Sequence, residues 1–205
     1  MSKVLHQCNT IAGDYLKIKD IAIAKSGMVL SRKRVGGFEK PAERYKVLTL
    51  KSISKHGKIN HEDLEEYHSS EKLSEGYITK EGDVVVRLRD PIIATYIGKE
   101  DENILVPSYF LKIRVLSDKI LPQYLTHYLN SKNAQKQFRQ HIAGTSIPMI
   151  KPNVIKSLEV PNVSLDRQRK IIKLLDCAQK ELILLDNLIE LKEKYYKSVC
   201  DKLME

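Results

Sequence analysis

Basic side chains gather in the first third of the sequence, and their chemistry suits contacts with phosphates and base edges. The stretch 31–46, SRKRVGGFEKPAERYK, contains two consecutive glycines and a proline, which are typical of a loop. An arginine in such a loop can donate to O6 and N7 of guanine, whereas a contact to phosphate carries no base information. Both interpretations of the loop stay open. The base-edge candidates are Arg32, Lys33 and Arg34, and the phosphate candidates are Arg44, Lys46, Lys51 and Lys55.

Two further groups of residues are candidates for binding a polyanion. Arg87 and Arg89 are two positions apart at the end of a predicted strand, so both could point into a groove. The alternative is that they are structural partners of Asp83 and Asp90. The turn at 144–146 offers backbone N–H groups and hydroxyls to a phosphate, or has a purely architectural role. The candidates at this turn are Thr145, Ser146 and the nearby Lys151.

The sequence contains no recognisable catalytic or metal-binding pattern. It has no Gly-rich phosphate loop ending in Gly-Lys-Ser/Thr, no Gly-x-Gly-x-x-Gly, and no Asn-Pro-Pro-Tyr or Asp-Pro-Pro-Tyr tetrapeptide. His56, His61 and His68 lie in a turn-rich stretch without a cysteine to complete a metal site. The three cysteines are scattered and form no Cys-x-x-Cys pair. We therefore predict a binding protein, and neither an enzyme nor a protein that holds a cofactor or metal.

The net charge of +9 is confined to the first third of the chain. Residues 1–60 hold 13 Lys or Arg and 4 Asp or Glu, and residues 61–205 hold 22 of each sign. A local positive surface attracts polyanions through counterion release, although a merely basic surface is the simpler alternative. The apolar runs are too short to span a bilayer, and the N-terminus lacks the apolar segment of a signal peptide. These features predict a cytoplasmic protein with no membrane partner.

The elements that must position these residues alternate between strand and helix patterns. The segments 15–30, 45–53, 84–86, 92–97 and 109–115 have the apolar pattern of strands, with a short helix expected within 61–76. From Pro122 the apolar spacing becomes helical, a second helix is expected at 133–142, and 143–163 is expected to be a loop with one short strand. Residues 1–163 are therefore predicted to form a mixed α/β (α+β) domain.

Residues 164–205 differ in kind from this domain, because no Gly or Pro follows Pro161 and Ser164 is placed as a helix N-cap near Gln168. About 40 helical residues would make a rod of roughly 60 Å, longer than the domain can cover. The regular apolar spacing, broken only by Lys192, predicts a coiled-coil seam. A helix lying across its own domain is the alternative. The seam residues are Ile171, Leu175, Ala178, Leu182, Leu185, Ile189, Tyr196, Val199 and Leu203.

The segment 143–171, AGTSIPMIKPNVIKSLEVPNVSLDRQRKI, resembles the junction before the long helix in type I restriction–modification specificity (S) subunits. Five other segments resemble the family in the same order, and together they cover nearly the whole chain. They are YLKIKDIAIAKSG, YKVLTLKSI, EGDVVVRLRD, VPSYFLKIRV and LPQYLTHYLNS. Arg89-Asp90-Pro91 departs from the Gly-rich sequence of many members, which puts in doubt any carry-over of roles at this point.

The resemblance implies a target-recognition domain followed by a long coiled-coil helix, without catalytic activity of its own. In full-length members two such halves occur in tandem, their helices pair antiparallel, and each domain recognises one half of a split DNA site. The implied partners are double-stranded DNA, modification (methyltransferase) subunits and restriction (motor-nuclease) subunits. This sequence holds one half, so it is either a natural half-subunit, whose helix pairs with a second copy or with another half-subunit, or a truncated full-length subunit. The competing interpretations are a free-standing dimeric DNA-binding regulator and a scaffold without DNA affinity.

Overall fold

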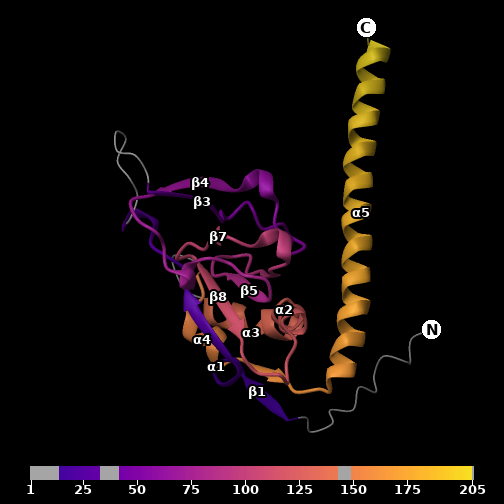
Figure 1. Ribbon diagram of the computed structural model, residues 1–205. Coiled ribbons are helices and arrows are strands. Elements are labelled where there is room, and N and C mark those ends of the chain that lie inside the picture. Colours follow the sequence, from indigo (N-terminus) through magenta and orange to yellow (C-terminus); the bar gives the residue numbers. More distant parts are fainter. Residues whose placement is uncertain (1–13, 33–41, 143–148, 205) are drawn as a thin grey trace, which may run out of the picture.

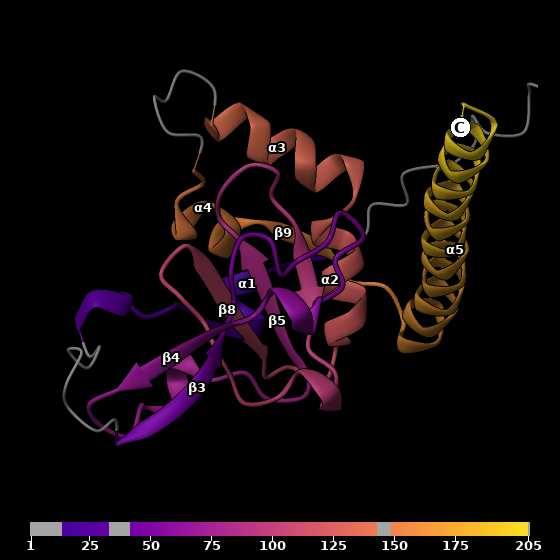
Figure 2. The ribbon, with the colours of Figure 1, turned by 90° about the horizontal axis from the view of Figure 1, so that it is seen from above.

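The computed structural model describes residues 14–32, 42–142 and 149–204. In these ranges nine strands and four helices form a globular body, and a fifth helix, α5 (Leu165–Met204), stands beside this body and extends well past it (Figure 1). Figure 2 shows that α2 is the element on the side of α5, whereas β3 and β4 lie on the opposite side of the body. The mixed α/β domain followed by a long C-terminal helix is therefore confirmed.

Three sheets organise the body. The main sheet has the order β2-β8-β5-β6, a second sheet has the order β4-β3-β7, and β1 pairs with β9. All of these pairs are antiparallel except β3 with β7. The strands are β1 (Tyr15–Lys17), β2 (Ala22–Ser26), β3 (Glu43–Val47), β4 (Glu65–Ser69), β5 (Asp83–Arg87), β6 (Ala94–Tyr96), β7 (Ile104–Leu105), β8 (Phe110–Val115) and β9 (Glu159–Pro161).

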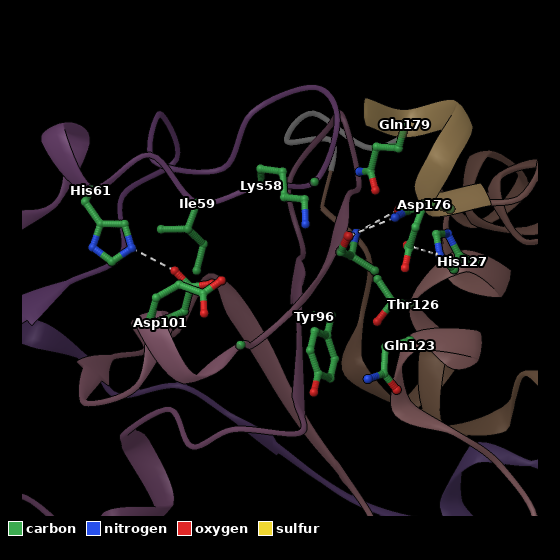
Figure 3. A pocket seen from close by; sticks show the side chains of 15 residues that line it. Lys58, Ile59, His61, Tyr96, Asp101, Gln123, Thr126, His127, Asp176 and Gln179 are labelled. Carbon is green, nitrogen blue, oxygen red and sulfur yellow. Dashed lines mark hydrogen bonds and ion pairs between the residues drawn. The ribbon is translucent and has the colours of Figure 1, made fainter. Parts of the chain in front are cut away.

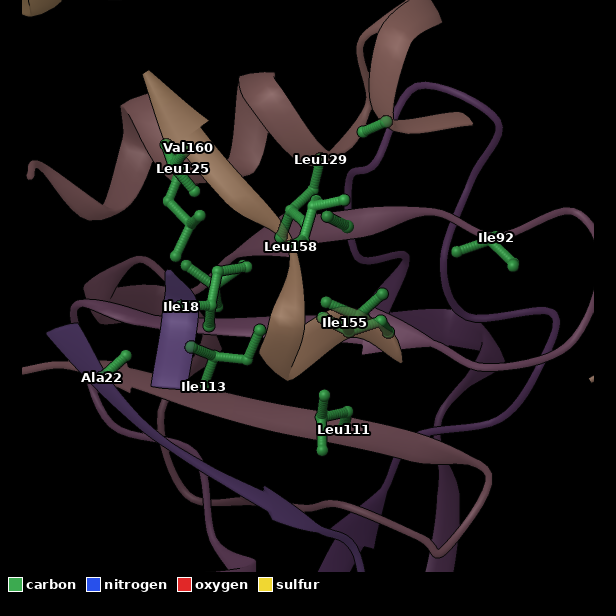
Figure 4. Packing of buried hydrophobic residues seen from close by; sticks show 14 of the residues in the cluster. Ile18, Ala22, Ile92, Leu111, Ile113, Leu125, Leu129, Ile155, Leu158 and Val160 are labelled. Carbon is green, nitrogen blue, oxygen red and sulfur yellow. The ribbon is translucent and has the colours of Figure 1, made fainter. Parts of the chain in front are cut away.

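The principal core lies between the main sheet and the four short helices. Val84 and Val86 of β5 and Leu111 of β8 face this core, while Val85 and Phe110 face the opposite side of the sheet. A strand buried on both faces explains why β5 is apolar at every central position rather than at alternate positions. Figure 4 shows the helices and β9 packed over these strands. The helices are α1 (Ile18–Ile21), α2 (Pro122–Leu129), α3 (Lys132–Ile142) and α4 (Pro152–Ser157).

The opposite face of the main sheet is covered by the irregular segment after β3 and by the second sheet. Leu48 and Ile53 pack with Val85 and Phe110, and Val47 and Tyr67 pack with Leu105 in a smaller cluster. This layer carries much of the basic sequence, so the way in which it packs decides which lysines and arginines reach the surface.

Three expectations about this region of the fold were wrong. The segment 61–76 contains the strand β4 between two 3₁₀ turns, η2 (His61–Asp63) and η3 (Glu75–Tyr77), and not a short helix. The segment 48–53 does not continue β3, and only an isolated bridge joins Ile53 to Ile59. The expected loop at 143–163 includes the helix α4, which is held through the fully buried Ile155.

The start of α5 is anchored to the body by one buried amide. Ser164 accepts a hydrogen bond from the backbone N–H of Arg167, as expected for an N-cap, but Gln168 does not reach back to complete a capping box. Its side chain is fully buried, donates to the carbonyls of Lys119 and Val163 at 2.7 and 2.8 Å, and accepts from Leu121 N at 2.8 Å.

We expect Gln168→Ala to lower the free energy of unfolding by about 2 kcal/mol, because it leaves three backbone groups at the base of α5 without their partner. Urea denaturation followed by circular dichroism measures the change. The control is Lys170→Ala, an exposed position on the same turn, which should change stability by less than about 0.5 kcal/mol. Equal stability of the two variants would mean that Gln168 is not an anchor.

Within the described ranges, no helix has the length and apolar character needed to cross a membrane.

Candidate DNA interface

Two basic side chains lie on β3, the central strand of the second sheet. Arg44 and Lys46 are exposed on one face of β3, and the alternating Tyr45 and Val47 turn toward the smaller core cluster. Lys46 lies opposite Glu66 of β4, with 3.6 Å between Nζ and the carboxylate, and both side chains are largely exposed. An exposed pair of this kind is worth little, so the lysine can exchange its carboxylate for a phosphate at little cost.

The basic loop begins beside the same strands. The 3₁₀ turn η1 (Leu30–Arg32) lies next to β4, because Tyr67 donates a hydrogen bond to the carbonyl of Leu30 at 2.8 Å. The chain of Arg32 therefore emerges at this edge of the sheet. Lys33 and Arg34 lie outside the described residues.

A cleft of about 560 Å³ opens where the β3–β4 ladder ends, at the pair Val47 and Glu65. Lys51 and Arg89 line this cleft, and both are exposed. Among the described residues neither has a hydrogen bond or salt bridge through its side chain. The cleft thus presents two uncommitted cations, one of them a guanidinium able to form paired hydrogen bonds.

Acidic and aromatic residues share the cleft with these cations. Tyr109 donates its hydroxyl to the carbonyl of Leu48 at 3.1 Å. Burial raises the pKa of Tyr109, nearby Glu65 raises it further, and Arg89 opposes both. Carboxylates repel phosphates, which favours a base-edge contact for Arg89, the cation that acts on Tyr109 together with Glu65.

A third group of candidates is joined to the cleft through the backbone. An isolated antiparallel bridge pairs Arg89 with Met149, which brings the exposed Lys151 into the neighbourhood of the cleft. Thr145 and Ser146, the hydroxyl candidates of the same segment, lie outside the described residues.

One of the basic candidates points inward instead. Arg87 is 7% exposed and donates to the carbonyls of Pro91 and Leu50 at 2.7 and 2.9 Å. Desolvation by this burial lowers the pKa of Arg87, and Asp90 partly offsets it. β5 ends at Arg87, so Arg87 and Arg89 do not share the strand face that was expected. The contacts of Arg87 are structural.

The ammonium group of Lys55 lies 2.7 Å from the carboxylate of Asp186 on α5. It is therefore committed to the long helix and is not brought to the cleft.

Two residues that line the cleft, Glu65 and Tyr109, were not predicted as DNA-binding candidates, because that prediction rested on positive charge alone. Nothing in the sequence marks Glu65 as a neighbour of Arg89, because the two residues meet only after β4 has paired with β3. The signal that was present is the acidic run from Glu62 to Glu66, which begins directly after the basic residues 1–60.

The candidate histidines are engaged with single carboxylates. His61 lies 2.8 Å from Asp101, and His56 lies 2.6 Å from Asp186. The described part of the chain contains no group of three or more His, Cys, Asp or Glu side chains that could hold a metal ion.

The apolar stripe of α5 is turned away from the body over most of its length. Gln168, Ile172, Asp176, Gln179 and Asp186 face the body, and they follow helical spacing. The seam runs about a third of a turn further round the helix. Its first member, Ile171, packs on the principal core, and Ala178 and Val199 are half-buried. Its other members are 38–81% exposed, namely Leu175, Leu182, Leu185, Ile189, Tyr196 and Leu203.

Comparison with known proteins agrees with this architecture. Residues 14–193 match the family model described as "Type I restriction modification DNA specificity domain". Over 122 residues the chain is 30% identical to the type I restriction enzyme MjaVIII specificity subunit of Methanocaldococcus jannaschii. The aligned region covers 57% of this chain and 27% of that protein.

Solved structures with the same fold are about twice as long. The HsdS subunit from Thermoanaerobacter tengcongensis superposes with a TM-score of 0.66 at 16% identity, over 87% of this chain and 45% of that chain. The type I restriction–modification S subunit from M. genitalium gives a TM-score of 0.57 at 18% identity, over 93% and 45%. The present chain thus spans less than half the length of these relatives. Since the family model covers most of its residues, the chain belongs to the type I restriction–modification DNA specificity domain family.

Proposed function

We propose that this chain is a non-catalytic, sequence-specific DNA-binding specificity subunit that recognises one half of a split site. The observation that carries the proposal is the family match over residues 14–193, on a structure with one recognition body and one long helix. Modification and restriction subunits are the proposed protein partners, and catalysis resides in them. A protein with these partners acts on DNA in the cytoplasm.

The proposed DNA surface runs along β3 and β4 to the cleft at their end. The exposed cations there supply the phosphate and base contacts, together with the loop residues that precede and follow them in sequence. Arg87 is left out because its donors are used within the fold, and Lys55 is left out because it lies beside α5 and does not line the cleft. The proposed residues are Arg32, Lys33, Arg34, Arg44, Lys46, Lys51, Arg89, Thr145, Ser146 and Lys151.

Arg89 is the proposed base-reading residue of the cleft. Its guanidinium can donate to O6 and N7 of guanine, and the carboxylate of Glu65 can accept from N4 of cytosine. The two groups line the same cleft, which fits recognition of a single base pair by residues of opposite charge.

We expect Arg89→Ala to reduce affinity for the preferred half-site about 5- to 150-fold, the equivalent of about 1–3 kcal/mol, and to relax selectivity at one base pair. Lys51→Ala should weaken binding to all duplexes similarly, as loss of a phosphate contact does. Fluorescence anisotropy on duplexes that differ at single positions separates these outcomes. If Arg89→Ala weakened all sequences equally, Arg89 would be a phosphate contact.

Selection from a randomised duplex library by the full chain tests the proposed function. Enrichment of one motif supports it, and co-purification with a methyltransferase subunit of the same family distinguishes a specificity subunit from a free-standing regulator. A chain that enriches a motif but captures no modification subunit is a regulator. A chain with no salt-dependent DNA affinity is a scaffold, and the proposal then fails.

A further inference from the structure

A short turn crosses from the body to the middle of α5. Residues 54–58, which we call the strut, are closed by hydrogen bonds from Ser54 N to the Lys58 carbonyl and from Gly57 N to the Ser54 carbonyl, both 2.9 Å. The Ser54 hydroxyl also accepts from Lys58 N at 3.1 Å. The turn is thus a structured projection and not a slack loop.

The tip of the strut converges on one oxygen of α5. Lys55 Nζ and His56 Nε2 lie 2.7 and 2.6 Å from the same Oδ2 of Asp186. Hydrogen bonds from His56 and Lys55 hold the pKa of the Asp186 carboxyl below its usual range. About two turns nearer the start of α5, the amide of Gln179 donates to the carbonyl of His56.

The base of the strut is fixed to the sheet and to α2. Gly57 is buried and has a φ of +68°, and a Cβ at this position would lie 2.8 Å from the carbonyl oxygen of Ala94. Only glycine fits both conditions without strain. Ala94 in turn exchanges two 2.8 Å hydrogen bonds with the side chain of Asn130, at the end of α2.

Beneath the strut, a cleft lies between the body and α5. The cleft has a volume of about 370 Å³. Figure 3 shows His61 and Asp101 on one wall and His127 and Asp176 on the other, each pair joined by a hydrogen bond. Of these, the 2.9 Å bond from His127 to Asp176 links the body to α5.

The long helix is therefore held at its base, at Asp176 through His127, and at the strut. At its base, Gln168 is bonded into the body, and Ile171 and Ile172 pack on the principal core. The strut holds Asp186, which lies 18 residues further on, or about 27 Å along the helix. If the base alone held α5, a tilt of about 10° would move the helix at Asp186 by about 5 Å and at its far end by about 9 Å.

We propose that the strut fixes the angle between the recognition body and α5, with Lys55 and His56 as positioning residues and Asp186 as their receptor. The consequence for recognition rests on the proposed function. Where α5 separates two recognition bodies, this angle sets the distance between the half-sites that they contact. A displacement of about 5 Å exceeds the 3.4 Å rise of one base pair, so a loosened strut admits spacers one base pair longer or shorter.

The direct test measures the angle in the absence of DNA. Asp186→Ala removes the receptor, and the exposed alanine preserves the helix. The matched control is Asp201→Ala, which deletes an exposed carboxylate on the same helix beyond the strut. Spin labels at Cys200 and at an introduced Lys99→Cys report the distance by pulsed electron resonance, with Cys8 and Cys177 replaced by serine. A tenfold excess of unlabelled chain suppresses distances between copies.

Wild type and Asp201→Ala should give one narrow distance distribution, and Asp186→Ala should broaden or shift it by about 5 Å or more. An unchanged distribution in Asp186→Ala would overturn the proposal. The second readout is spacer length among duplexes selected from a library of paired half-sites. Asp186→Ala should enrich the same bases with neighbouring spacer lengths. If Asp186→Ala broadens the distances but selects the same single spacer length, the role of the strut in spacing is refuted. If the wild-type chain enriches no motif, the proposed function is refuted, and the distance measurement alone then tests the strut.

Discussion

Asp83→Ala is expected to lower the free energy of unfolding by about 3–5 kcal/mol, because it leaves a buried cation without its counter-ion. The carboxylate of Asp83 is fully buried and accepts two hydrogen bonds from Arg114 Nε and Nη2, both at 2.7 Å, and a third from Lys80 N at 3.0 Å. Lys112, which is 5% exposed, has its ammonium 3.7 Å away. Urea denaturation of the purified chain measures the loss.

The cost of this variant comes mainly from Lys112. Its ammonium donates to the carbonyls of Glu75 and Ile78 at 3.0 and 2.6 Å, but Asp83 supplies the only buried negative charge near it among the described residues. Burial lowers the pKa of Lys112, and Asp83 opposes that shift, so its removal favours the neutral amine. Glu75→Gln is the control, because it removes an exposed carboxylate from the same neighbourhood and should cost less than about 1 kcal/mol. A similar small loss in Asp83→Ala would show that the buried network contributes little.

The elements that could be predicted from the sequence are those whose pattern is set by burial on a regular repeat. The Val84–Val86 run is buried on both faces of the main sheet, and the 40 residues of α5 lack Gly and Pro. In contrast, β4 carries Glu65, Glu66 and His68, and only Tyr67 and Ser69 are buried. Such a polar segment becomes a strand because its backbone pairs with β3. This pairing is a tertiary effect that local strand propensity does not predict.

The direction of single basic side chains is harder to predict, because it depends on contacts between distant segments. Arg87 and Arg89 are two residues apart, yet one is bonded to the carbonyl of Leu50 and the other is exposed in a cleft. Lys55 is committed to a carboxylate 131 positions later in the chain. The contacts of the polar face of α5 were equally hard to predict. Asp176 and Asp186 have the sequence pattern of solvent-exposed helix residues, and their partners lie on distant segments of the body.

The second large effect is expected in the seam of α5. Beyond Asp186, no described residue of the helix forms a hydrogen bond or salt bridge with the body, although the exposed Ile189, Tyr196 and Leu203 continue the apolar stripe. A single helix of this length gains most of its stability from packing of its apolar face, so we expect a second helix to pack against the stripe. We expect the chain to self-associate through this seam as a dimer of about twice 23.6 kDa.

Leu185→Asp combined with Tyr196→Asp should convert this dimer to a single copy at micromolar concentration, as measured by light scattering. Each substitution removes the burial of a large apolar side chain, worth about 1.5–3 kcal/mol, and places a charge against the partner helix. Asn187→Asp, an exposed position off the seam, adds the same charged group and should leave the dimer intact. A symmetric dimer is expected to select a palindromic split site, since the two-fold symmetry of the protein is mirrored in the DNA. The double variant should then select one half-site without a partner site at fixed spacing. A wild-type chain that is already a single copy would contradict self-pairing and would assign the seam to a different helix, from another half-subunit or from the modification subunit.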